Sequence, residues 1–213
     1  MTIVTSDASG SGGYPRKRAR TRRALMSAGM SVLAHKGPDG ATVGEIARTA
    51  RVATGTFYNH FPSIGDLVVA VTDDLSTGVR IGRDTLEAIE HDPAVRVVLG
   101  TEQLLDLAED DPEAAAAFVA LLATVPDFRD RVRSVVGGAI EDGITAGRFA
   151  ERPVPLVTDA LLGSVIQWMR TILNEPTSAS ERDERLLIAL SIVGVAQSKQ
   201  RQVLRKRPDA LAP

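Results

Sequence analysis

Hydrogen-bonding side chains are concentrated in one short stretch of the chain, TGTFYNHF, which begins at Thr54. Hydroxyl, phenol, amide and imidazole groups follow one another up to His60, and only Phe57 and Phe61 are strongly apolar. These two residues are four apart, so in a helix they lie on one face and leave the polar groups largely on the other. Such polar groups bind phosphate oxygens and base edges in the DNA major groove. The stretch is a candidate DNA-binding helix.

The residues before this stretch predict the helices that would position it. Thr42 and Glu45 have the T-x-x-E spacing of a capping box and predict the start of a short helix, which ends near Arg51. A longer amphipathic segment from Arg16 precedes it and ends near Gly37. A long helix, a short helix, a tight turn and a second short helix predict a helix-turn-helix. On spacing alone, an ordinary amphipathic helical hairpin is the alternative.

The charge distribution agrees with a nucleic-acid partner. The segment up to His60 carries nine basic and three acidic residues, a balance of +6, so the rest must carry −8 to reach the net charge of −2. A basic end on an acidic body is typical of proteins that bind phosphates. A solubilising basic tail is the alternative that charge alone leaves open.

Composition excludes several other classes. The chain has 213 residues, 44% of them hydrophobic, and no cysteine, so disulfides and thiolate metal sites are excluded. The polar N-terminus does not resemble a signal peptide, and no apolar run approaches the roughly 18 residues of a membrane span. We therefore expect a cytoplasmic protein without a membrane partner.

The remaining sequence predicts an all-α architecture of about nine helices. No segment shows the alternating pattern of a strand, and helical segments are predicted at 93–109, 112–124, 127–147, 154–174 and 180–206. We predict a disordered tail at 1–14, a helix-turn-helix domain at 15–62, a helical ligand-binding and dimerisation domain at 63–207, and a tail at 208–213.

The N-terminal sequence RALMSAGMSVLAHKGPDGATVGEIARTARVATGTFYNHFPSIGDL resembles the DNA-binding domain of TetR/AcrR-type transcriptional regulators. About 50 residues carry this resemblance. The matching positions are Ala28, Leu33, Gly37, Thr42, Val43, Ile46, Ala47, Ala50, Val52, Gly55, Thr56, Phe57, Tyr58, His60, Phe61 and Leu67.

The resemblance implies a homodimeric regulator, a repressor by the family's usual behaviour, that binds a pseudo-palindromic operator. A small molecule entering the C-terminal body would release it, and we predict an apolar or amphipathic one. No enzymatic activity, cofactor or metal is expected. Combined with the basic arm before Leu25, the resemblance predicts these DNA contacts: Arg18, Arg20, Thr42, Arg51, Thr54, Gly55, Thr56, Tyr58, Asn59 and His60.

Three positions depart from the family's pattern. Arg51 occupies the turn position that is usually glycine, where a left-handed backbone would be strained by about 1 kcal/mol. Ala53 stands where a serine cap is common, so Thr54 is the expected substitute cap. Ile64 replaces a lysine that usually contacts phosphate, and a backbone amide at that helix N-terminus is its possible replacement.

The C-terminal body carries two further predictions. Segments 155–173 and 185–204 are apolar almost all round, so they must be covered on two sides. The resemblance implies that they form a four-helix dimer interface, and a monomeric core is the alternative. The predicted interface residues are Leu162, Val165, Ile166, Leu190 and Val193. The predicted ligand-pocket residues are Leu104, Leu105, Phe118, Leu121, Leu122, Phe128 and Trp168.

Two alternative functions remain at this point. A DNA-binding regulator without a small-molecule ligand has the same N-terminal motif, and a cavity in the body would distinguish the two. An all-α enzyme is the remote alternative: Glu87 and His91 are four apart, but no second histidine has the spacing of a metal ligand.

Overall fold

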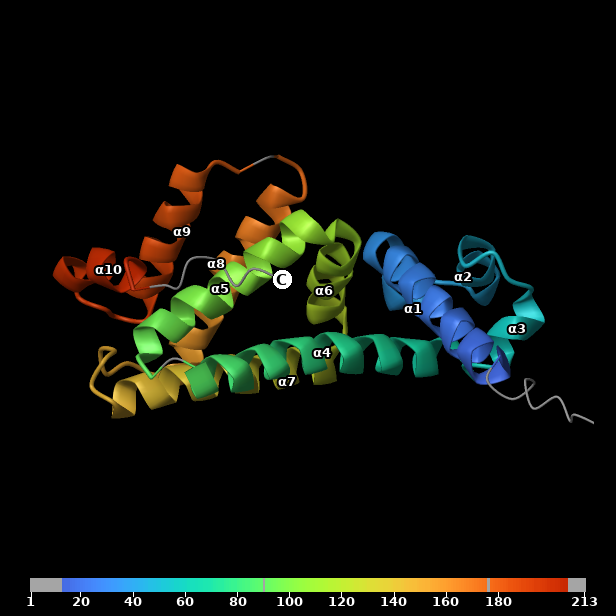
Figure 1. Cartoon of the computed structure of the whole chain (residues 1–213), viewed down its shortest axis with the longest axis horizontal. Helices are drawn as coiled ribbons and strands as arrows, with labels where there is room; N and C mark the ends of the chain where they lie inside the picture. The colour runs from blue at the N-terminus through green and yellow to red at the C-terminus, as the bar shows by residue number, and fades with distance from the viewer. Residues whose placement is uncertain (1–12, 90, 176, 207–213) are drawn as a thin grey trace, which may run out of the picture.

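The DNA-binding motif lies at one end of an elongated, all-helical molecule (Figure 1). The computed structural model describes residues 13–89, 91–175 and 177–206, and the side chains of all these except 13–15 and 79–89. At this end lie α1 (Gly13–Gly40), α2 (Val43–Thr49) and α3 (Thr54–Tyr58). The long helix α4 (Ile64–Ile89) runs from this end along the body. The predicted boundary at residue 62 falls between α3 and α4; most of both predicted tails lies outside the described residues.

Six further helices form the body. They are α5 (Pro93–Asp110), α6 (Pro112–Thr124), α7 (Pro126–Thr145), α8 (Val154–Ile172), α9 (Ala179–Ile192) and α10 (Gln197–Leu204). Helix α6 packs against α1, so the body touches the DNA-binding end through α6 as well as α4. The described residues contain ten helices and no strand, which confirms the predicted all-α class.

Prolines and capping side chains set many of the helix starts. Pro93, Pro112 and Pro126 each lie in the first turn, where a missing backbone N–H costs nothing. Asp92 and Asp111 accept hydrogen bonds from the amides of Ala94 and Ala114, each at 3.0 Å.

One predicted helix is two helices in the structure. The segment 180–206 is interrupted at Gly194, which has φ +84°. The Val195 amide donates to the Leu190 carbonyl, and the Gly194 amide donates to the Ser191 carbonyl, a Schellman ending. A side chain at Gly194 would also clash with Ala150, since an added Cβ would lie 2.5 Å from the Ala150 Cβ. The turn separates α9 from α10 and accounts for ten helices instead of nine.

A continuous set of buried side chains connects both ends of the molecule. Leu25, Ile46, Phe57 and Phe61 form its DNA-binding end, each 2% exposed or less. No helix among the described residues combines the length and apolarity that crossing a membrane would require.

Candidate DNA-binding surface and body cavity

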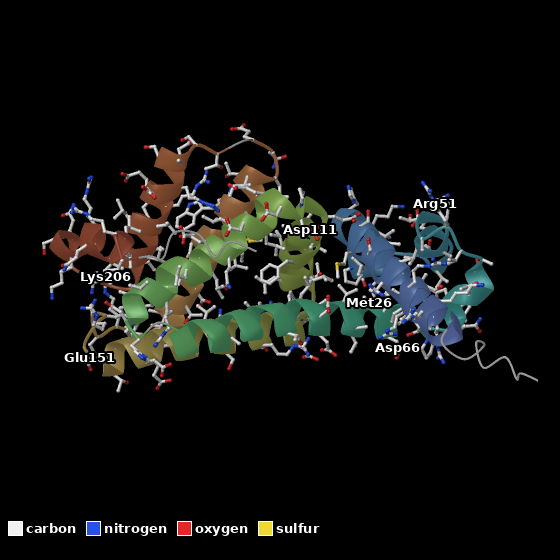
Figure 2. All side chains as sticks on the ribbon, viewed as in Figure 1. Met26, Arg51, Asp66, Asp111, Glu151 and Lys206 are labelled. Carbon is white, nitrogen blue, oxygen red and sulfur yellow. The ribbon has the colours of Figure 1, made fainter. Side chains whose placement is uncertain are left out.

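The turn between α2 and α3 is a Schellman motif with arginine at the glycine position. The Val52 amide donates to the Ala47 carbonyl at 2.9 Å, and the Arg51 amide donates to the Arg48 carbonyl at 3.0 Å. Arg51 has φ 56° and is the only non-glycine residue with positive φ in the described part of the chain. The strain foreseen for Arg51 is therefore present, and its exposed side chain lies at the DNA-binding end (Figure 2).

Helix α3 has one buried side chain and an outward polar face. Phe57 is fully buried, whereas Tyr58 is 55% exposed. Thr54, Gly55 and Asn59 are also exposed, as the spacing of the two phenylalanines predicts. The polar groups of this helix are therefore presented to a partner outside the molecule.

The prediction that Thr54 caps α3 is wrong. Ala53 occupies the N-cap position and no side chain makes the capping hydrogen bond. Thr54 is the first residue inside the helix, because its predecessor already has the extended backbone of a cap. The Thr54 hydroxyl is thus not used for capping, which leaves it for an external acceptor.

Arg22 links the basic start of α1 to the end of the DNA-binding helix. Its guanidinium donates to the His60 carbonyl at 3.4 Å and lies 4.4 Å from the centre of the Phe61 ring. Arg22 therefore positions α3, a role that its charge alone did not reveal. Burial lowers the pKa of His60 below its ordinary 6.5, and the nearby charges of Arg18 and Arg22 lower it further. Both effects favour the neutral form of the His60 imidazole.

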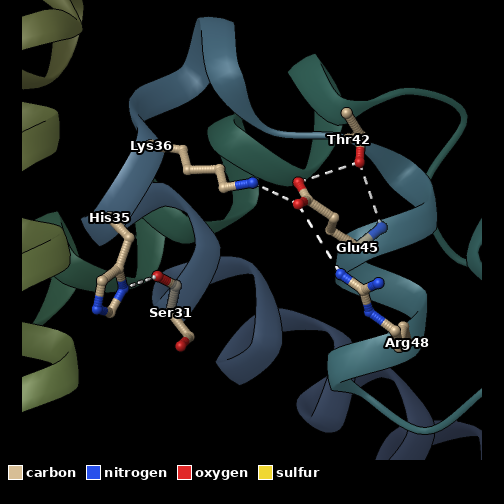
Figure 3. A network of polar contacts seen from close by, with 6 residues as sticks. All are labelled: Ser31, His35, Lys36, Thr42, Glu45 and Arg48. Carbon is tan, nitrogen blue, oxygen red and sulfur yellow. Dashed lines mark hydrogen bonds and ion pairs between the residues drawn. The ribbon is translucent and has the colours of Figure 1, made fainter.

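Thr42 caps α2 within a polar network around Glu45 (Figure 3). The Thr42 hydroxyl accepts from the Glu45 amide at 3.3 Å and donates to the Glu45 carboxylate at 3.2 Å. That carboxylate also pairs with Lys36, and Arg48 lies 3.9 Å away. The hydrogen bond from Lys36 is the main reason that the pKa of Glu45 is lowered. The network holds the beginning of α2 against the end of the helical segment before Gly37.

Ser63 caps the start of α4. Its hydroxyl accepts from the Asp66 amide at 3.2 Å and donates to the Asp66 carboxylate at 2.6 Å. Ile64 packs partly against the core, so no cationic side chain occupies that position. Asp66 adds a negative charge at this helix end, which disfavours a phosphate contact there.

A cavity of about 500 Å³ lies in the body. It is bounded by α4, α5, α6, α7 and α8, and Met30 of α1 also contributes to its wall. Along α5 its lining follows the spacing of one helix face: Val97, Thr101, Leu104 and Leu107. Its size is in the usual range of small-molecule sites. No group of three or more His, Cys, Asp or Glu side chains that could hold a metal occurs among the described residues.

The sequence model of a family described as "Bacterial regulatory proteins, tetR family" matches residues 25–71. This match spans the end of α1, the helix-turn-helix and the start of α4. The helix-turn-helix part of this chain is therefore similar to that of TetR-family transcriptional regulators. A comparison with curated protein sequences found no match.

Solved structures resemble this chain over most of its length. RolR in complex with resorcinol is 25% identical, with TM-score 0.62, and the match covers 93% of this chain and all of RolR. A γ-butyrolactone receptor described as ArpA-like is 18% identical, with TM-score 0.70, covering 88% of this chain and 95% of the receptor. A TetR-family transcription regulator from Marinobacter aquaeolei VT8 is 17% identical, with TM-score 0.73, covering 85% of this chain and all of that protein. The latter two likenesses concern the fold.

The body cavity is lined by only part of the predicted ligand-pocket set. Leu104 and Phe118 line it. Leu105, Leu121, Leu122 and Phe128 are buried in the core outside its lining, and Trp168 is half-buried and also outside it. Phe118 and Phe128 do meet, edge to face with ring centres 5.4 Å apart, but only Phe118 lines the cavity. Small residues such as Ala139 and Gly78, which sequence analysis passed over, form part of the wall.

The residues predicted at the dimer interface mostly face inward. Leu162 and Val165 line the cavity, and Leu190 and Val193 are 1% exposed or less. Ile166 is half-buried. Side chains buried inside one subunit have no surface to offer a second, so any interface on α8 and α9 must use their other faces.

Proposed function

We propose that the protein is a repressor that binds a pseudo-palindromic operator as a homodimer in the cytoplasm and leaves it when a small apolar or amphipathic molecule fills the body cavity. The observation that carries the DNA-binding part is the outward polar face of α3, held by Phe57 in a TetR-type helix-turn-helix. Tyr58, Asn59 and His60 are proposed to contact bases or phosphates, together with the exposed Arg18 and Arg20 of α1. Thr42, Arg51, Thr54, Gly55 and Thr56 complete the proposed contact set.

A dimer interface is proposed on the outer faces of α8 and α9. Leu156 on α8 is 67% exposed and Ile188 on α9 is 47% exposed. The small residues Ala160 and Gly163 are also exposed on α8. A Cβ added at Gly163 would meet nothing within 4 Å inside the subunit, so space is open there for another helix.

Gly163→Arg is therefore expected to produce monomers and weaken operator binding, whereas Gln197→Arg on exposed α10 should leave the dimer intact. Analytical ultracentrifugation distinguishes them, and a dimeric Gly163→Arg contradicts the interface.

We propose that ligand binding causes release of DNA through both connections between the body and the DNA-binding end, which are α4 and the contact of α6 with α1. The cavity touches α1 at Met30 and α4 at Leu75 and Gly78, and its Phe118 belongs to α6, which packs on α1. A ligand that alters these contacts shifts the two DNA-binding helices of a dimer relative to the fixed spacing of the half-sites. It does so only through its different affinity for the two states, typically about 1–3 kcal/mol.

Selection of binding sites from random duplex DNA tests the proposal. The expected product is a two-fold-symmetric site whose half-sites lie about one helical turn or more apart. Its affinity should exceed non-specific binding by at least about 10³-fold at physiological salt. Enrichment of no sequence, or of an asymmetric site bound by one subunit, would contradict the proposal.

A DNA-binding regulator without a small-molecule ligand is the second candidate. The cavity favours the ligand-responsive form, because a body that only dimerises does not need about 500 Å³ of largely apolar-walled space.

A further inference from the structure

Thr101 is the one polar side chain buried in the cavity wall. The other polar or charged lining residues, Asp74, Arg96, Gln103 and Asp111, are exposed or half-buried, so they lie toward its rim. Thr101 is 4% exposed and sits on α5 among the apolar residues of the lining face. The interior of the cavity is thus apolar except for a single hydroxyl.

The Thr101 hydroxyl differs from those of the other buried threonines. Thr72 donates to the Val69 carbonyl at 3.0 Å, and Thr158 donates to the Val154 carbonyl at 2.8 Å. Thr101 makes no hydrogen bond to any residue that the structure describes, although its helix offers a carbonyl one turn back. The Thr101 hydroxyl therefore has no hydrogen-bond partner within the described part of the protein.

This hydroxyl is open to the cavity and not sealed by protein. Among the described residues that are not exposed, Arg182 Nε is the only side-chain nitrogen or oxygen that is both sealed from solvent and without a partner. The Thr101 hydroxyl oxygen also lacks a partner but is not in that class. It is therefore not sealed from solvent and must border open space. The open space next to Thr101 is the cavity. It can therefore both donate to and accept from a molecule placed there.

The charges around the cavity disfavour an acidic ligand. Asp74 and Asp111 contribute two carboxylates. Arg96 is the single cation in the lining formed by described residues, and it already interacts with another group. A carboxylate inside the cavity would lose its hydration and meet no compensating charge in the interior.

We propose that the effector is a neutral, mostly apolar molecule with a hydroxyl or carbonyl group that hydrogen-bonds Thr101. This rests on the proposed function, in which the cavity is the effector site. Thr101 sets specificity: it favours ligands that carry one polar group over hydrocarbons of the same shape, because only the former satisfy its hydroxyl.

Three probe molecules that share one ring system separate the effect of the hydrogen bond to Thr101 from the effect of ligand charge. They are 2-naphthol, 2-methylnaphthalene, in which a methyl group replaces the hydroxyl, and 2-naphthoate, which carries a charge. Their dissociation constants for the full-length protein are measured by fluorescence titration. The readout is the affinity of naphthol relative to methylnaphthalene, compared between protein variants, since transfer from water by itself favours the methyl compound.

Thr101→Val removes the hydroxyl and keeps the shape of the side chain. The affinity of naphthol relative to methylnaphthalene is expected to fall about 3- to 10-fold in this variant, the worth of one hydrogen bond. Thr158→Val is the matched control, because Thr158 is also buried but bonds its own helix and does not line the cavity. The control should keep the wild-type ratio. Naphthoate should bind the wild type at least about tenfold more weakly than naphthol.

Several results would overturn the inference. They are an unchanged ratio in Thr101→Val, an equal change in Thr158→Val, naphthoate binding as tightly as naphthol, or no binding of either neutral probe. Operator titrations on the same preparations test the proposed function separately. If the probes bind as expected but leave operator affinity unchanged, the hydrogen-bonding role of Thr101 stands and the effector role of the cavity fails.

Discussion

The DNA-binding end and the body cavity use polar side chains in opposite ways. Helix α3 buries one phenylalanine and turns its polar groups to solvent, while the cavity turns apolar walls inward around the hydroxyl of Thr101. A charged, hydrated partner such as DNA requires many outward donors, and a small apolar partner requires enclosure with few directional contacts. The first kind of site can be built from a few consecutive residues, whereas the second needs walls from six helices.

Adjacent residues of α3 should separate stability from DNA binding most strongly. Phe57→Ala removes a fully buried ring and is expected to cost about 3–5 kcal/mol of unfolding free energy. Tyr58→Phe keeps the ring and removes only an exposed hydroxyl, so stability should change by less than about 0.5 kcal/mol. Operator affinity of Tyr58→Phe should fall about tenfold through lost phosphate hydrogen bonds. Urea unfolding and gel-shift titration measure both, and a Tyr58→Phe variant with unaltered affinity breaks the contrast between the two residues.

Substitution of Met30 should show whether the body cavity and the DNA-binding end are coupled through α1. It belongs to α1 yet lines the cavity, so Met30→Ala should reduce the effect of an effector on operator affinity by about threefold or more. Met26, one turn earlier on α1, is also half-buried but does not line the cavity (Figure 2). Met26→Ala is therefore the control and should retain the effect. The measurement is operator titration of each variant with and without effector. An equal loss of the effector's influence on operator affinity in both variants would instead indicate a general loosening of α1.

Arg51 offers a smaller, two-sided test at the DNA-binding end. Arg51→Gly relieves the left-handed backbone and should raise unfolding free energy by up to about 1 kcal/mol. It also removes a cation near the phosphates, so operator affinity and its salt dependence should both decrease. Arg51→Ala should lose the same affinity without the gain in stability. If neither variant changes the salt dependence, Arg51 does not contact the DNA backbone.

His60 should give the smallest effect, on the pH dependence of binding. Its pKa in the free protein is lowered by burial and by Arg18 and Arg22, while nearby DNA phosphates favour the protonated imidazole. Binding then takes up a proton, so affinity should rise about two- to fivefold as the pH falls from 7.5 to 6. Without DNA the sign is reversed: the lowered pKa makes the fold less stable as pH falls through 6.5. His60→Gln should show a flatter affinity profile, and identical profiles would exclude this proton uptake.

The sequence by itself predicted the DNA-binding motif and most of the helices, but not the break at Gly194. Caps at Thr42 and Ser63, the left-handed turn at Arg51, and the outward face of α3 all depend on residues within about one helical turn. Such local features depend on hydrogen bonds and contacts between residues three or four apart, so they depend little on how distant segments pack.

Only the tertiary structure decided which apolar faces meet each other. Sequence periodicity placed Leu162 and Val165 on an apolar stripe of α8. Periodicity alone does not show which stripe of an all-round apolar helix faces the cavity and which faces outward. The same limit hid the role of Arg22, whose partner lies 38 residues away. It also hid Thr101, which is distinctive only because its neighbours leave a cavity beside it. These features arise from contacts between distant segments, and those contacts are set by packing of the whole core.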